Sequence, residues 1–516
     1  MFRGFCCSVF FVCLLAMSIT TPGCGGGDDS GGGGGSGGGG SSGPESDLTA
    51  VSSVNESDII HFLRRTHFGF HPDDLANVQS MGYAAYVDWM LSMPAQTSVE
   101  NAATAAEISD VNFPGSTAIM RWWVHIMNRT ANPFQEVLAM FWHDHFAASS
   151  DALDLTATFW LWDHVDLWRN HVTGTLGDLL YDMSTDWLML VWLNGAESTV
   201  TAPNENFARE FWELFSLGAD NGYTQADIEE AARSFTGYRN VFSANHFGPG
   251  LDSRQIVWEP ARHDNGTKTI FGQTVTGNGQ QEYRDIVNLT LNQRGMQVAR
   301  FICRKLWEYF VYRNPGNAVI DDLAQGFVAS GFDLKALYRR MFLSTAFFSD
   351  RAREPLVKNV MEHHVGYMRA TGLFINSQRI DFSLRECGQE PTRPPTVNGW
   401  PKHMAWMSSQ SVLERGNFLR DCNFYFSDPP QAGWDAGALL PPGVTTDAQV
   451  VDYLAYLLQV TLTPAQRAEA LTYINSDRNA GGVFSQPWDI GSATQRDKKI
   501  RGLLYIFGLH PTYQLR

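Results

Sequence analysis

Cysteine is scarce in this sequence, and its distribution excludes a disulfide-built scaffold. Only seven cysteines occur among 516 residues, and four of them lie before residue 25. The remaining three, Cys303, Cys387 and Cys422, cannot all pair with one another. Cys303 lies in a helical apolar pattern and is expected to be a buried hydrophobe. Cys387 and Cys422 lie near irregular chain, so their pairing in an oxidising compartment stays open.

Positive charge is also in short supply. Lysine and arginine total 38 against 54 acidic residues, which gives a formal net charge of −16. Nucleic-acid binding depends on basic contacts to phosphate, so this balance argues against a nucleic-acid partner. It equally argues against binding to anionic lipid through a cluster of basic residues. Solubility is the simplest explanation for the acidic surface.

Several common catalytic motifs are missing altogether. The sequence contains no phosphate-binding Walker loop and no dinucleotide glycine fingerprint after a strand. It also contains no Gly-x-Ser-x-Gly nucleophile elbow, no His-Glu-x-x-His helix and no Cys-x-x-Cys or Cys/His zinc spacing. Any enzymatic function must therefore use a site outside these classes.

The N-terminal segment predicts export and lipid anchoring. Arg3 precedes an apolar run from Phe5 to Met17, which is too short to span a bilayer but suits a signal peptide. The sequence Thr21-Pro22-Gly23-Cys24 resembles a bacterial lipobox. We therefore expect a signal peptide over residues 1–23 and a lipidated Cys24 at the start of a flexible Gly/Ser-rich tether over 24–45. Ordinary secretory cleavage is the alternative, and Gly25 after the cysteine favours the outer membrane.

Residues 46–516 predict a mainly α fold, as a single large multi-helix domain or two subdomains, with a small β-hairpin insertion. Capping residues precede proline at Asn132-Pro133 and Thr463-Pro464, and Thr224-x-x-Asp227 forms a capping box. The predicted helices span 56–66, 83–93, 118–128, 133–147, 156–172, 204–217, 224–235, 281–291, 296–312, 333–343, 355–371, 412–426, 447–458, 464–475 and 493–507.

One β signal stands out from the helical pattern. The segments 255–264 and 267–275 flank Asn265-Gly266, a dipeptide that favours a two-residue type I′ hairpin turn. This turn explains Asn265 and Gly266 without any function. It does not explain why His263, Asp264 and Lys268 cluster at the tip. Rigid loops often present site residues, so we treat these three as candidates beside the simpler reading of a polar surface tip.

Several further segments occur in a fixed order and spread over most of the chain beyond the tether. They are 67–69 (HFG), 141–146 (FWHDHF), 204–210 (NENFARE), 213–215 (ELF), 224–227 (TQAD), 232–237 (ARSFTG), His263-Asp264-x-Gly266-x-Lys268, 304–307 (RKLW) and 394–401 (PPTVNGWP). Together these segments resemble the domain-of-unknown-function 1800 family of bacterial secreted and envelope proteins. The resemblance carries no established activity. It implies an envelope or secreted location and a frequent genomic neighbourhood with secreted sulfatase-like proteins.

The histidines of the 141–146 segment diverge on a continuous helix. Successive helical residues advance by about 100°, so His143 and His145 point roughly 160° apart and share a metal only if the helix breaks. His145 falls on the stripe of Leu138 and Phe141, which should face the core. It is then either a buried, hydrogen-bonded histidine or an acid, base or ligand in the wall of an interior cleft.

The 204–217 helix combines an apolar face with a charged one. Glu205, Arg209 and Glu213 recur at intervals of four, as in a solvated ladder of ion pairs. The family segment also includes Glu210. If this polar face turns inward, paired carboxylates tuned by Arg209 are suited to acid and base roles.

Tryptophan is abundant, with 16 residues, and most of it is expected to pack in the core. The loop from Pro394 to Trp400, together with Trp406, is the best candidate for an exposed aromatic surface.

Two hypotheses follow for the function. In the first, His145, Glu205, Arg209, Glu210, His263, Asp264 and Lys268 converge in a catalytic cleft, with or without a divalent metal. The enzyme then acts by hydrolysis or group transfer on an envelope or extracellular polysaccharide, including sulfated or phosphorylated glycans. In the second, the protein is a non-catalytic anchored scaffold for a secreted sulfatase-like protein or a surface polymer, and its motif charges are satisfied in fixed ion pairs.

Overall fold

A computed structural model describes residues 44–108, 115–153, 160–242, 254–375, 377–425, 427–428, 434–479 and 482–516. The expected signal peptide, the lipidated cysteine and nearly all of the tether lie outside these residues. Ser42–Arg516 form one compact unit. No helix among the described residues is long and apolar enough to cross a membrane.

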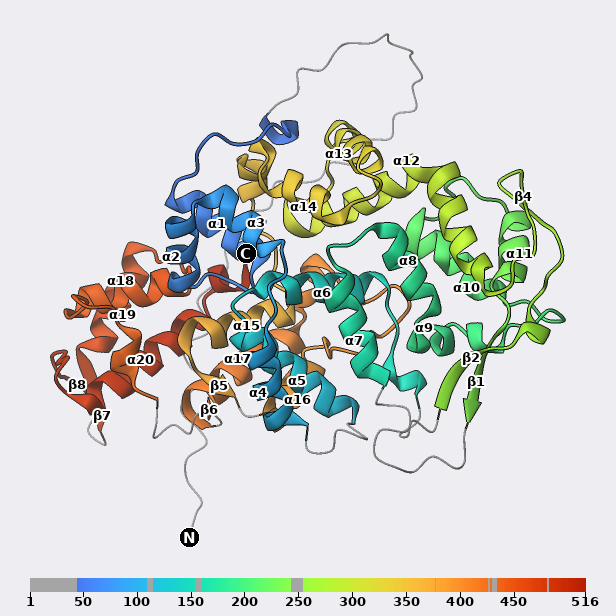
Figure 1. Ribbon diagram of the computed structural model, residues 1–516. Helices are drawn as coiled ribbons and strands as arrows, with labels where there is room; N and C mark the ends of the chain where they lie inside the picture. The colour runs from blue at the N-terminus through green and yellow to red at the C-terminus, as the bar shows by residue number, and fades with distance from the viewer. Residues whose placement is uncertain are drawn as a thin grey trace, which may run out of the picture. The chain divides into compact units, whose positions relative to one another are not determined.

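The mainly α prediction is confirmed (Figure 1). The helices are α1 (Glu56–Thr66), α2 (Pro72–Met81), α3 (Tyr83–Met90), α4 (Thr97–Glu107), α5 (Ser116–Arg129), α6 (Pro133–His145), α7 (Trp160–His171), α8 (Leu176–Thr185), α9 (Trp187–Trp192), α10 (Glu205–Glu210), α11 (Gln225–Ser234), α12 (Glu282–Phe310), α13 (Asn317–Ala329), α14 (Leu334–Phe342), α15 (Val360–Thr371), α16 (Ser377–Glu386), α17 (Ser409–Arg420), α18 (Asp447–Leu457), α19 (Pro464–Ile474) and α20 (Ala493–Gly508).

Strands among the described residues form antiparallel pairs only. The pairs are β1 (Tyr238–Phe242) with β2 (Arg254–Trp258), β3 (Lys268–Ile270) with β4 (Gln273–Val275), β5 (Phe374–Ile375) with β6 (Ser427–Asp428), and β7 (Ser476–Asn479) with β8 (Gly482–Ser485). Apart from isolated bridges, small two-stranded sheets on a helical body are therefore the β content of this part of the chain.

The hairpin predicted around Asn265-Gly266 is wrong. The tight turn lies at Phe271-Gly272, between β3 and β4, where φ is 51° and 72° as a type I′ turn requires. At Asn265-Gly266 the chain bends differently, because the Asp264 side chain accepts a hydrogen bond from the Gly266 amide at 2.8 Å. This Asx-type bend makes the segment an ordered loop, so His263 and Lys268 are not at an exposed hairpin tip.

Local capping explains where several helices begin. The capping box predicted at Thr224 with Asp227 is present. Thr463 caps α19 as predicted, and it does so within a capping box with Gln466. Pro133 opens α6 as expected, but the Asn132 side chain does not cap that helix. Its amide instead donates to the Met90 carbonyl at 2.8 Å, which ties α6 to the end of α3. A tertiary contact has replaced the local cap.

Helix α6 runs through the hydrophobic core and is buried on almost every side. It packs against α7 and also contacts α1 and α5. Tryptophans fill much of the surrounding space, as expected: Trp122, Trp123, Trp142, Trp168, Trp212 and Trp307 are all buried. Because α6 is held from several directions, the side chains at its C-terminal end project from a rigid support.

The last residues of the sequence return to the middle of the fold. Leu356 and Arg516 exchange two backbone hydrogen bonds, of 2.9 and 2.7 Å. The red C-terminal helix α20 packs on α17, α18 and α19 (Figure 1). These contacts place the Arg516 side chain beside α12 and the start of α15.

Candidate functional site

A polar cleft opens where the C-terminal end of α6 meets α12. Its walls come from α6, α12, the segment that leads into α15, the loop at 400–406, and Arg516. Its cavity volume is about 120 Å³, which is enough for several waters or a small chemical group. The cleft therefore gathers segments that are far apart in the sequence around one accessible space.

Lys305 and His145 form the centre of this cleft. His145 Nε2 lies 3.0 Å from the Phe215 carbonyl oxygen, so it carries the proton and donates. Its Nδ1 is then an acceptor, and Lys305 Nζ lies 3.0 Å from it. Lys305 Nζ also donates to the Leu214 carbonyl at 3.2 Å. Among the described residues, no carboxylate is placed within ion-pair distance of the Lys305 ammonium.

Burial is the main cause of the unusual electrostatics of this pair. It lowers the pKa of Lys305 to about 7, with a further contribution from the charge of Lys402, against the opposing effect of Asp144 and Glu308. Burial also holds the pKa of His145 well below its usual range, with Lys305 as the next cause. The imidazole is therefore neutral, and the amine changes its charge near neutral pH.

A π-helical turn supplies the two carbonyl groups that hold this pair. Helix α10 continues into a wide turn over Phe211–Ser216, in which Leu217 N donates to the carbonyl of Trp212, five residues earlier. Carbonyls at the end of a helix have no partner in the next turn. Those of Leu214 and Phe215 accept from Lys305 and His145 instead. Wide turns of this kind are frequent at functional sites.

Asp144 fastens the loop that forms the opposite wall. Its Oδ1 accepts from the Trp400 amide at 2.8 Å, and its Oδ2 lies 3.1 Å from Lys402 Nζ. Gly399 has φ of 80°, and a Cβ there would overlap Asp144. Only glycine combines this backbone conformation with so close an approach. Trp400 and Trp406 line the cleft but are largely buried, so the expected exposed aromatic surface is a cleft wall instead.

The remaining charged wall consists of Glu362 and Arg516. Both side chains are buried, and Arg516 Nη1 lies 2.5 Å from Glu362 Oε1. Tyr309 donates to the same carboxylate oxygen at 3.4 Å, and burial raises its pKa. This pair is a fixed ionic contact, in contrast with Lys305.

The polar face of α10 does not reach the cleft. Arg209 lies 3.4 Å from Glu205 and 3.6 Å from Glu213, and all three side chains are partly exposed. Gln225 of α11 completes the ladder through contacts to Glu205 and Arg209 of 2.8 Å. Glu210 lies beside the ladder, where burial and Glu213 raise its pKa. The cleft lining includes none of these four charged residues, Glu205, Arg209, Glu210 and Glu213.

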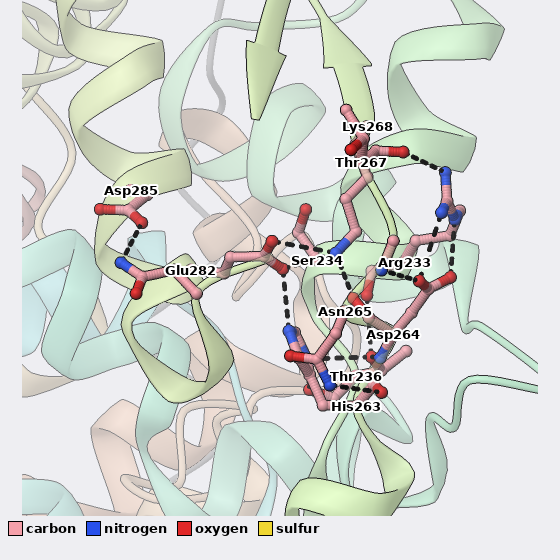
Figure 2. Close-up of polar contacts among 12 residues, drawn as sticks. Arg233, Ser234, Thr236, His263, Asp264, Asn265, Thr267, Lys268, Glu282 and Asp285 are labelled. Carbon is pink, nitrogen blue, oxygen red and sulfur yellow. Dashed lines mark hydrogen bonds and ion pairs between the residues drawn. The ribbon is translucent and has the colours of Figure 1, made fainter. Parts of the chain in front are cut away.

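Two side chains of the segment from His263 to Lys268 enter a buried ionic cluster with Glu282 (Figure 2). Lys268 Nζ and His263 Nε2 converge on the carboxylate of Glu282, at 2.7 and 2.9 Å. His263 Nδ1 donates to the Thr236 carbonyl at 2.9 Å. Asp264 instead pairs with Arg233 at 2.7 Å. The three predicted residues are thus brought together, but they are held by ionic partners from α11 and α12.

Helix α11 keeps the ladder and this cluster apart. Gln225 contacts the ladder and Arg233 contacts Asp264, and eight residues of helix between them span about 12 Å. Neither group lines the cleft that contains His145. The structure therefore resolves the seven predicted site residues into three separate places.

His143 and His145 diverge as predicted, because α6 is continuous to His145. His143 Nε2 accepts from the Thr392 amide at 3.0 Å, on a different side of the helix from Lys305. The described residues contain no group of three or more His, Cys, Asp or Glu side chains arranged to hold a metal ion. Cys303, Cys387 and Cys422 are buried and unpaired.

Sequence reasoning missed Lys305, Glu362, Lys402 and Arg516 as site residues. Lys305 gave the strongest signal, because it follows Phe301 by four residues and so interrupts an apolar helical stripe. It also lies in one of the family segments. No local pattern marks Glu362 or Arg516, which meet only through tertiary contacts.

The fold and the cleft define an all-α protein with a buried lysine at an accessible site. Its sequence matches the profile of DUF1800, described as a protein of unknown function, over residues 61–515, and the chain belongs to that family. No curated protein and no solved structure matches the chain.

Proposed function

We propose that this protein is an acid–base enzyme in which Lys305 exchanges protons with a substrate bound in the cleft between α6 and α12. The observation that carries the proposal is the placement of the Lys305 amine. It lies in the cleft wall, 3.0 Å from a neutral imidazole, and its pKa is about 7. An amine with a pKa near the working pH can accept and return a proton in one reaction cycle.

His145 is a positioning residue in this proposal. Its Nε2–H is committed to the Phe215 carbonyl and its pKa is far below neutrality, so it does not take up a proton. Its Nδ1 accepts from Lys305 and directs the amine. The lone pair of the deprotonated amine is then free to accept a proton from a water or hydroxyl group, which becomes the nucleophile for hydrolysis or group transfer.

The lining of the cleft favours a glycan as substrate. Tyr309, which is partly exposed, and the small exposed parts of Trp400 and Trp406 provide aromatic lining, and Lys402 at the rim provides a cation that is about half exposed. Aromatic faces pack against sugar rings, and a cation attracts carboxylate, sulfate or phosphate substituents. The substrate class is therefore an envelope or extracellular polysaccharide with anionic groups.

Two product assays on a panel of neutral and anionic polysaccharides test this proposal. New reducing ends report hydrolysis, and ultraviolet absorbance of an unsaturated sugar reports elimination instead. Lys305→Met should lower kcat/KM by at least about 100-fold, the usual contribution of a general base. Lys335→Met, which removes a lysine of α14, is the matched control. Full activity in the Lys305→Met variant would reject the proposal.

We also propose that the protein is exported and lipid-anchored through Cys24. The lipobox-like segment and the Gly/Ser-rich tether support this location. Cys24→Ser should move the protein from the membrane fraction to the soluble fraction. Unchanged membrane association would show that another segment holds the protein.

A second candidate function is a non-catalytic scaffold that holds a sulfatase-like protein or a surface polymer. Its support is the ionic pairing of the family segments at Arg209 and Lys268, which predicts rigid surfaces. Detergent extraction followed by co-purification tests this idea, with Lys305→Met as the discriminating variant. A scaffold keeps its partner when Lys305 is replaced, whereas recovery of no partner contradicts the scaffold.

A further inference from the structure

A second, smaller cavity lies behind the cleft and is surrounded by positive charge. Its volume is about 20 Å³, and its polar lining consists of Arg64, Lys358, Gln459 and Arg516. Arg516 also lines the cleft, so it separates the two spaces. A volume of this size suits a water molecule or a monatomic ion.

Lys358 is the most unusual side chain of this cavity. It is only 6% exposed, and its ammonium lies 3.7 Å from the centre of the Tyr513 ring. Among the described residues, the structure gives this ammonium no hydrogen-bond acceptor and no carboxylate. A buried ammonium normally has a paired counter-charge, because its desolvation is costly.

Other cations around Lys358 increase the need for a counter-charge. Arg65 and Arg415 are each 1% exposed, and the Nε atoms of Arg65, Arg415 and Arg516 have no hydrogen-bond partner. Their other donors mostly contact neutral oxygens, such as the carbonyls of Ala352 and Lys358.

Negative charge at this place comes from Glu362, which is already bound to Arg516 at 2.5 Å. Burial holds the pKa of Lys358 well below its usual range, and the positive charge of Arg64 lowers it further. Glu362 opposes these effects but does not contact the ammonium. The cluster therefore combines several buried cations with one carboxylate.

We propose that the cavity between Arg64, Lys358 and Arg516 binds a monatomic halide ion of the chloride type. The ion supplies the counter-charge with which the buried Lys358 amine can keep its proton, and the small volume favours a monatomic ion over sulfate, phosphate or a carboxylate. Because Arg516 lines both spaces, the bound ion also steadies the Arg516–Glu362 contact at the back of the cleft. The proposal is independent of the reaction catalysed in the cleft.

Thermal unfolding of the purified full-length protein tests the site. Sodium chloride and sodium bromide are compared with sodium gluconate at matched ionic strength. Chloride and bromide should raise the Tm in a saturable way by on the order of 2–4 °C, because they bind the folded state only. Equal Tm values in chloride and gluconate at all concentrations would overturn the proposal.

Lys358→Met separates site binding from general salt effects. The variant should lose the saturable chloride response, yet its Tm in gluconate should equal or exceed that of the wild type, since the uncompensated charge is gone. Lys335→Met is the control and should keep the response. A saturable response that survives in Lys358→Met would refute the assignment.

Chloride NMR provides a test that needs no variant to fold. The ³⁵Cl line of the wild-type sample should be broader than that of a protein-free sample at the same chloride concentration, and it should narrow again when bromide is added. A line that bromide does not change would contradict a specific halide site.

Discussion

A buried lysine and a partly buried one lie in opposite electrostatic settings in this protein. Lys268 lies 2.7 Å from the carboxylate of Glu282, within a cluster that also includes His263. Lys305 lies 3.0 Å from a neutral histidine, and the Leu214 carbonyl is its other acceptor. The carboxylate of Glu282 keeps Lys268 in an ion pair, whereas the neutral partners of Lys305 allow its amine to gain or lose a proton. A family segment containing a lysine can therefore mark either a structural lock or a reactive group.

The largest expected effect is the loss of the structural lock. Glu282→Ala leaves Lys268 buried without its counter-charge, so we expect a loss of about 3–5 kcal/mol in the free energy of unfolding. Chemical denaturation followed by fluorescence measures it. The double variant Glu282→Ala/Lys268→Met should recover part of the loss, and no recovery would argue against a pairwise contact.

Lys305→Met should produce a pH-dependent change in stability. The unfolded lysine has a pKa of about 10.4, so between about pH 7 and pH 10 the unfolded state binds more protons than the folded state. Wild-type stability should therefore rise with pH relative to the variant, by about 1–3 kcal/mol from pH 7 to pH 9. Parallel curves for the two proteins would mean that the Lys305 amine is charged throughout this pH range. Lys268→Met, which removes the ion-paired lysine, is the comparison variant.

Gly399→Ala tests the wall opposite Lys305. The new Cβ would overlap Asp144, and φ of 80° is unfavourable for alanine, so the loop must shift at a cost of about 1–3 kcal/mol. Because this loop carries Trp400 and Lys402, we expect a higher KM with a smaller change in kcat. Gly388→Ala, at a similar φ of 82° with open space around it, controls for backbone strain alone.

The smallest effect is expected in the α10 ladder. Arg209→Ala removes contacts between partly exposed groups and should cost less than about 1 kcal/mol. Activity should stay near the wild-type level, because Arg209 does not line the cleft. A large loss of activity with unchanged stability would return Arg209 to the catalytic candidates.

Helical periodicity predicted the fold class and most of the helices, but it missed α2, α4, α8, α9, α13 and α16. α9 consists of Trp187-Leu188-Met189-Leu190-Val191-Trp192, which is apolar on all sides and therefore shows no amphipathic period. The Asn265-Gly266 signal misled, because tertiary contacts of Asp264 and Lys268 decided the path of the chain. Local turn preference was weaker than the buried ionic cluster.

The candidate site was predictable only in part. His145 was chosen from its place on the apolar stripe of α6, and it does line the cleft. Its neighbours come from segments more than 60 residues away, such as Leu214 and Lys305, and no spacing rule links them. The exposed ladder and the buried cluster showed charge patterns as strong as that of the site, so sequence alone could not rank the three.

The wide turn at Phe211–Ser216 also limits how the length of the chain can change at this site. A π turn contains one residue more than the α-helical turn it replaces, and that residue rotates everything before it by about 100° relative to everything after it. Deleting one residue here would restore a regular helix, withdraw the carbonyls of Leu214 and Phe215, and swing the α10 charges toward the core. Relatives that keep the cleft should therefore show no single-residue gap between Phe211 and Ser216, and loops elsewhere can vary in length.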